Sequence, residues 1–128
     1  MRAIGYRKAS PELDHLEAFD IPKPSAQGRD LLVEVRAVSV NPVDYKVASG
    51  GGPGAPRESD DIKVVGYDAA GVVVETGQDA RLFKPGDEVF YAGSVGRQGA
   101  NAEFHLVDER IVGRKLRTLD FVAAAALP

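Results

Sequence analysis

The chain has 128 residues, of which 44% are apolar and 27% are charged, and these values are typical of one globular domain. Sixteen basic and nineteen acidic residues give a net charge of −3, which argues against a nucleic acid or an acidic membrane as the partner. There is no cysteine, so disulfides and thiolate metal ligands are excluded. No signal-peptide pattern and no apolar run of about 20 residues occur, and from the absence of these signals we expect a cytoplasmic protein.

The first half of the chain predicts short strands separated by polar turns. Residues 2–6 and 16–21 are strand candidates, and a loop rich in proline and glycine follows them. Residues 31–40 form the best candidate, because apolar side chains at 31, 33, 35 and 37 alternate with Glu34 and Arg36. Asn41-Pro42 ends this strand, and Pro42 begins a short predicted helix that runs to about Ser49.

The second half continues this pattern after a surface loop. Residues 50–61 combine glycine, proline and charge and predict a flexible loop. Strands are expected at residues 71–75, 88–91 and 102–107. Several short strands closed by glycine and proline turns favour a mainly β fold, arranged as a barrel.

Three glycines between the strands predict specific backbone features. Gly71 should let another backbone approach its strand closely. Gly77 is expected to end that strand in a turn with positive φ. Pro85-Gly86 predicts a second tight turn before residue 88.

A glycine-rich segment at residues 92–99 invites comparison with a nucleotide-binding loop. Such a loop needs a helix after it, whereas residues 102–107 alternate like a strand, so we expect a hairpin loop. The only histidines, His15 and His105, have no carboxylate at a diagnostic spacing and are expected at the surface or partly packed.

The last ten residues differ from the rest. Thr118 is a plausible N-cap for an apolar helix over residues 120–127. A helix that is apolar on nearly every side should pack inside a larger body, so we expect a truncated protein. We divide the chain into a domain at residues 1–117 and, at 118–128, the start of a helix that leads into an absent domain.

Several short motifs together resemble the medium-chain dehydrogenases/reductases, the superfamily of alcohol dehydrogenases and quinone reductases. They are Pro22-Lys23-Pro24 before residues 30–35, Ser39-Val40-Asn41-Pro42-Val43-Asp44, residues 66–71, residues 86–89, Ala102-Glu103-Phe104 and residues 123–128. The resemblance covers essentially the whole chain. It implies the GroES-like catalytic domain, a partly open β-barrel with short flanking helices, and a cofactor-binding Rossmann domain that is missing from this chain.

The same motifs separate the zinc enzymes of this superfamily from the zinc-free ones. The zinc enzymes carry Cys and then His-Glu where this chain has Asn41 and then Tyr67-Asp68. A neutral amide and a phenol with a pKa near 10 are poor zinc ligands. The structural zinc site needs four cysteines where this chain has residues 92–100. We therefore expect no metal, and the resemblance points to the quinone oxidoreductase-like subgroup that is often labelled zinc-binding alcohol dehydrogenase.

This subgroup implies an NADPH-dependent enzyme that transfers hydride to a quinone or an α,β-unsaturated carbonyl. Without zinc, hydrogen-bond donors near the developing enolate would assist the transfer. The cofactor would be bound mainly by the absent domain, so these residues alone should be inactive. The resemblance also implies a small-molecule substrate and a parent protein that is a homo-oligomer.

Five residues are candidates for the site, and each has a structural alternative. Asn41 could contact nicotinamide or substrate, or cap the helix that Pro42 begins. Tyr45 and Tyr67 could donate a proton or line the cleft, or simply pack. Asp68 could line the cleft or bond backbone amides at a strand end, and Lys46 could meet cofactor phosphates or be solvated.

Two other functions remain open. A zinc-type alcohol dehydrogenase domain would require stoichiometric zinc. A stand-alone module like a co-chaperonin would use a long mobile loop with an apolar tripeptide, and residues 50–61 contain no such tripeptide.

Overall fold

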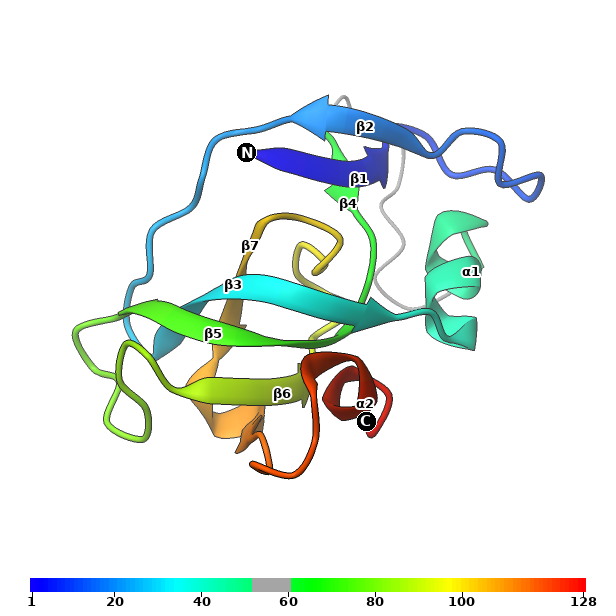
Figure 1. The fold of residues 1–128 in the computed structure, drawn as a ribbon. Helices are drawn as coiled ribbons and strands as arrows, with labels where there is room; N and C mark the ends of the chain where they lie inside the picture. Colours follow the sequence, from blue (N-terminus) through cyan, green and yellow to red (C-terminus); the bar gives the residue numbers. More distant parts are fainter. Residues whose placement is uncertain (52–60) are drawn as a thin grey trace.

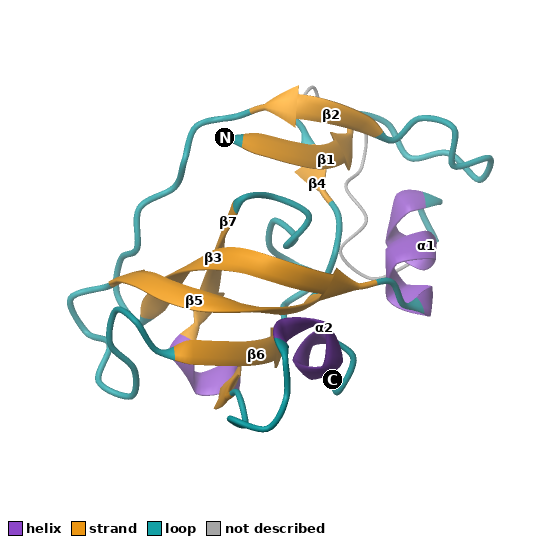
Figure 2. Cartoon of the chain, viewed as in Figure 1, coloured by secondary structure: helices purple, strands orange, loops and turns teal. Residues whose placement is uncertain are grey.

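The structure is a computed structural model that describes residues 1–51 and 61–128, so the predicted loop at 50–61 lies mostly outside the described residues. The chain folds into two β-sheets and two short α-helices. The helices lie at the margin of the sheets (Figures 1 and 2). The strands are β1 (Arg2–Tyr6), β2 (Glu17–Asp20), β3 (Asp30–Ser39), β4 (Lys63–Val64), β5 (Asp68–Thr76), β6 (Glu88–Ala92), β7 (Phe104–Asp108) and β8 (Val112–Arg114). The helices are α1 (Pro42–Ala48) and α2 (Phe121–Ala125), with a 3₁₀ turn at Glu109–Ile111.

The strands form a three-stranded sheet in the order β2-β1-β4 and a five-stranded sheet in the order β7-β3-β5-β6-β8. The backbone N–H of Ile4 donates to the carbonyl of Asn101 at 2.8 Å, which joins the small sheet to the segment before β7. In the described part of the chain, strand pairing leaves both sheets open. The predicted mainly β, partly open architecture with short helices is therefore confirmed.

The main hydrophobic core is built mostly from side chains of the larger sheet. Leu31 and Val33 from β3, Val73 from β5 and Val89 from β6 are fully buried there. β3 and β5 can approach closely because Gly71 has no Cβ. A Cβ at this position would lie only 2.2 Å from the carbonyl oxygen of Glu34. The close approach predicted at Gly71 is thus confirmed.

Helix α1 begins at Pro42, as predicted, and is capped at its C-terminal end by Ser49. Its inner face carries Val47 and Ala48, which are 0% and 2% exposed. The hydroxyl of Tyr6 donates to the carbonyl of Val47 at 3.0 Å and ties the helix to β1.

Two predictions about turns have different outcomes. Gly86 has φ +95° and the N–H of Asp87 donates to the carbonyl of Lys84 at 3.1 Å, so the tight turn is confirmed. The prediction of a positive φ at Gly77 is wrong, because Gly77 is not among the described glycines that have positive φ. Gly77 is needed for space, since a Cβ there would lie 2.3 Å from the carbonyl oxygen of Gly28.

Residues 93–103 do not form the predicted hairpin loop. A strand follows them, as expected, but β6 pairs with β5 and β8 while β7 pairs with β3. The segment therefore crosses from one part of the sheet to another. His105 on β7 is 4% exposed, so its predicted place at the surface or in partial packing is also corrected.

The C-terminal helix is shorter than expected. Its N-cap is Asp120 rather than Thr118, since the Asp120 carboxylate accepts the N–H of Ala123 at 2.7 Å. Ala124 and Ala125 are buried against β5, while Val122 is 72% exposed. Neither helix of the described chain is long and apolar enough to span a membrane.

Candidate active site

The candidate site forms where the end of β3 meets the start of β5. Ser39, the last residue of β3, pairs with Asp68, the first residue of β5. The chain turns from Ser39 through Asn41 into α1, so this pairing brings Asn41 beside Asp68. Figure 1 shows this end of the sheet close to α2.

A chain of hydrogen bonds orients the Asn41 side chain. Nδ2 of Asn41 donates to Oδ2 of Asp68 at 2.5 Å and to Oγ of Ser39 at 2.9 Å. The Ser39 hydroxyl in turn donates to the carbonyl of Ala125 in α2 at 2.9 Å. Because the Asp68 carboxylate can only accept, the amide nitrogen and not the amide oxygen faces it. Asp68 thus binds the side chain of Asn41.

Asp44, in the first turn of α1, is a site residue that the sequence analysis did not select. It is 9% exposed, and its Oδ2 accepts the backbone N–H of Asn41 at 2.8 Å. Its Oδ1 is buried without a hydrogen-bond partner. Burial raises the pKa of Asp44, and Asp68 adds to this, while the N–H groups of Asn41 and Gly66 act in the opposite direction. The Asn-Pro-x-Asp motif was the available signal, since its Asp sits one turn after the N-cap.

Tyr67 lies inside the domain. Its side chain is 2% exposed and its hydroxyl is buried without a hydrogen-bond partner. Burial, followed by the nearby Tyr6 and Asp44, raises the pKa of Tyr67 to about 12. The phenol is therefore protonated at neutral pH.

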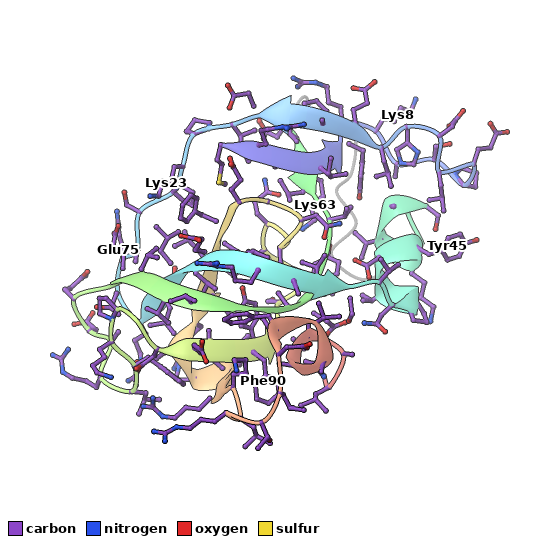
Figure 3. The ribbon with its side chains drawn as sticks, in the orientation of Figure 1. Lys8, Lys23, Tyr45, Lys63, Glu75 and Phe90 are labelled. Carbon is purple, nitrogen blue, oxygen red and sulfur yellow. The ribbon has the colours of Figure 1, made fainter. Side chains whose placement is uncertain are left out.

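Tyr45 and Lys46 lie on the outer face of α1. Tyr45 is 55% exposed, and Figure 3 shows its ring pointing away from the body of the domain. Lys46 is exposed as well. The structure therefore brings Asn41 and Asp68 together, buries the Tyr67 hydroxyl without a partner, and leaves Tyr45 and Lys46 at the neighbouring surface.

The described residues contain no group of three or more His, Cys, Asp or Glu side chains that could hold a metal ion. At the positions of the zinc ligands in the related enzymes, the nitrogen of Asn41 faces Asp68 and the hydroxyl of Tyr67 is protonated in the interior. Neither side chain is a donor that zinc prefers.

A cavity of about 600 Å³ lies away from this cluster, between the small sheet and β7. Its lining includes Met1, Ile21, Pro22, Gln98, Phe104 and Leu106. None of the five predicted site residues lines it, so it is separate from the candidate site.

The fold, two open β-sheets with short helices, is that of a GroES-like domain. Residues 27–116 match the alcohol dehydrogenase GroES-like domain. The chain belongs to this family, within the medium-chain dehydrogenase/reductase superfamily.

Known relatives carry the names of both zinc-type and quinone-type enzymes. The chain is 41% identical, over its full length, to a zinc-type alcohol dehydrogenase-like protein of Staphylococcus aureus (strain COL), and it spans 37% of that protein. A protein named as a zinc-dependent alcohol dehydrogenase, from Rhizobium etli CFN 42, has 60% identity and a TM-score of 0.90, with 100% of this chain and 36% of that chain covered. The Escherichia coli quinone oxidoreductase complexed with NADPH has 27% identity and a TM-score of 0.84, with 99% and 37% covered.

Proposed function

We propose that this chain is the catalytic domain of a longer, NADPH-dependent oxidoreductase that reduces a quinone or an α,β-unsaturated carbonyl without zinc. The observation that carries the proposal is the hydrogen bond from Nδ2 of Asn41 to Asp68. Asn41 stands where the zinc enzymes carry a zinc-binding cysteine. Its amide nitrogen, which makes this bond, is a hydrogen-bond donor and not a metal ligand.

The longer protein is part of the proposal because the chain covers only 36–37% of the three proteins described above. In this proposal residues 1–117 form the catalytic domain, and residues 118–128 lead into a domain that binds most of the NADPH. The whole enzyme would be a homo-oligomer. Exposed Val122 and Leu127 on and after α2 are consistent with further protein packed here.

Bound NADPH would supply the hydride, and this domain would bind and orient the acceptor. Asn41 is partly buried just past the end of β3, where it would contact the nicotinamide or the substrate. The Tyr45 hydroxyl on the outer face of α1 donates to the oxygen that becomes negative as hydride arrives. Lys46, which is exposed on the same helix, would bind the cofactor phosphates.

The reaction class can be tested in the full-length protein that contains this domain. We expect quinones or enones to accelerate NADPH oxidation, with no loss of rate after chelator treatment and no stoichiometric zinc by metal analysis. If alcohol oxidation requires bound zinc, or if no quinone or enone is reduced, the proposal is wrong.

The site assignment calls for two substitutions. Asn41→Ala and Tyr45→Phe should each lower kcat/KM by roughly 10- to 100-fold, because each removes one polar group from the transition state. Asp79→Asn is the control, since Asp79 is exposed on the turn after β5. Unchanged kcat/KM in both variants would contradict the assignment.

A zinc-type alcohol dehydrogenase domain is the second candidate, and it is favoured by the names of the relatives with 41% and 60% identity. The chelator and metal-analysis arms of the same experiment decide between the two. The co-chaperonin-like alternative loses support, because the family matched over residues 27–116 is that of alcohol dehydrogenases.

A further inference from the structure

We propose that Asp44 positions Asn41 in the site, with its carboxylate held between the backbone N–H of Asn41 and the hydroxyl of Tyr67. This inference rests on the proposed function, in which Asn41 contacts nicotinamide or substrate. It assigns Tyr67 to the support of the site, where the sequence suggested a proton donor.

The first contact lies within the turn that begins α1. Oδ2 of Asp44 accepts the backbone N–H of Asn41 at 2.8 Å. The N–H of Asp44 donates back to the carbonyl of Asn41 at 3.0 Å. These two bonds set the direction in which the chain leaves β3, and with it the position of the Asn41 amide.

The second contact joins α1 to the residue before β5. Oδ1 of Asp44 and the hydroxyl of Tyr67 are both buried polar atoms without a hydrogen-bond partner. Their side chains are 9% and 2% exposed. Buried polar atoms in folded proteins almost always find a partner, so two orphans on neighbouring elements point to each other. A direct hydrogen bond or one bridging water would satisfy both.

The electrostatics agree with this geometry. Burial raises the pKa of Tyr67, and the negative charges of Tyr6 and Asp44 add to this effect. The backbone N–H of Gly66, next to Tyr67 in the chain, lowers the pKa of Asp44, so it also faces this carboxylate. The other titratable neighbours of the Tyr67 ring are Tyr6 and Lys63, whose Nζ lies 5.8 Å from the ring centre.

Together the contacts form a closed arrangement of four residues. Asn41 and Asp44 lie three positions apart at the start of α1, and Tyr67 and Asp68 are consecutive at the start of β5. Asn41 bonds to Asp68 through its side chain, and in this proposal Asp44 bonds to the Tyr67 hydroxyl. A hydroxyl held inside this arrangement cannot also face a substrate, so Tyr67 acts through Asp44.

The kinetic test uses the full-length enzyme with Asp44→Ala, Asp44→Asn and Tyr67→Phe. Asp44→Ala should lower kcat by about 10- to 100-fold, as expected when a supporting partner of a site residue is lost. Asp44→Asn should keep kcat within about 3-fold of the wild type, because its amide can still accept from Asn41 and pair with Tyr67. Asp79→Ala, on an exposed turn, is the matched control.

Tyr67→Phe keeps the test decisive if Asp44→Ala does not fold. It should lower kcat modestly, by about 3- to 10-fold, with an unchanged pH profile, because it leaves Asp44 intact but without its partner. Wild-type kcat in Tyr67→Phe, or in folded Asp44→Ala, would overturn the proposal. A loss above about 1000-fold with an altered pH profile would also overturn it, since such a loss marks a proton donor.

A spectroscopic arm separates this proposal from the proposed function. In the chain of 128 residues with ¹³C-labelled tyrosine, the Cζ resonance of Tyr67 is assigned by its loss in Tyr67→Phe. Asp44→Ala should shift this resonance, because Cζ reports the hydrogen bonding of the phenol. An unshifted resonance overturns the contact, whatever reaction the full-length protein catalyses. A shifted resonance supports it even if no quinone or enone is reduced.

Discussion

The hydroxyl of Tyr91 and Nδ1 of His105 lie 2.9 Å apart in the core and join β6 to β7, two strands that do not pair with each other. The two rings stack with centroids 5.5 Å apart. On the other side of the imidazole, Nε2 lies 2.9 Å from the carbonyl oxygen of Gln98. A carbonyl can only accept, so Nε2 carries a proton. Burial lowers the pKa of His105 to about 4, so at neutral pH the ring is neutral and Nδ1 accepts from the tyrosine hydroxyl.

This neutral imidazole makes the stability of the domain depend on pH. Burial lowers the pKa of His105 from its usual 6.5 to about 4, so the unfolded chain binds a proton more readily than the folded chain. The neutral imidazole adds on the order of 3 kcal/mol to the free energy of unfolding. This contribution is complete above pH 6.5 and is lost as the pH falls towards 4. Urea unfolding at steps across this window measures the loss. His105→Gln should flatten the slope, and equal slopes in the two proteins would contradict the prediction.

Gly71→Ala should destabilise the domain by at least about 2 kcal/mol, because the added Cβ would lie 2.2 Å from a backbone oxygen of β3 that cannot move away cheaply. Gly28→Ala is the matched control. Gly28 has φ +58° with no heavy atom near the added Cβ, so its cost should be about 1 kcal/mol from backbone strain alone. Chemical denaturation compares the two, and an equal loss would show that close packing at Gly71 is unimportant.

Lys63 is 9% exposed, and its Nζ donates to the carbonyls of Val95 at 3.2 Å and Arg97 at 2.5 Å. Lys63→Met should cost about 1–3 kcal/mol, because it leaves both carbonyls without this donor. Faster amide hydrogen exchange in residues 93–99 should accompany the loss. Lys46→Met, at an exposed position of α1, should leave stability within about 0.5 kcal/mol. Unchanged exchange in Lys63→Met would rule out this role.

Glu109 is 1% exposed and accepts from the backbone N–H groups of Arg81 and Leu82, each at 2.9 Å, and from Arg29 at 2.8 Å. Burial alone would raise the pKa of Glu109, but these donors outweigh it and lower the pKa. Glu109→Gln should cost about 3 kcal/mol, because it removes the buried charge that they share. Glu88→Gln tests a surface carboxylate and should cost less than about 1 kcal/mol. Similar losses in the two variants, by thermal or chemical unfolding, would contradict this account.

Elements with a strong local signal were predicted well. The alternation over residues 31–40 located β3, Asn41-Pro42 located the start of α1, and Lys84-Pro85-Gly86-Asp87 located a tight turn. β4 and β8 were missed because strands of two and three residues are too short to show periodicity. Asp120 replaced Thr118 as the N-cap because the apolar run begins only at Phe121.

The sequence by itself determined the type of domain and the kinds of side chain available as metal ligands. The strand-and-turn pattern and family motifs are local properties, and the lack of cysteine excludes thiolate ligands whatever the fold. Only the tertiary structure decided where the side chains face. The pairing of Ser39 with Asp68 turned the Asn41 amide toward a carboxylate, and burial placed the Tyr67 hydroxyl in the interior without a hydrogen-bond partner. Such contacts depend on register and burial between distant segments, which residue spacing along the chain does not encode.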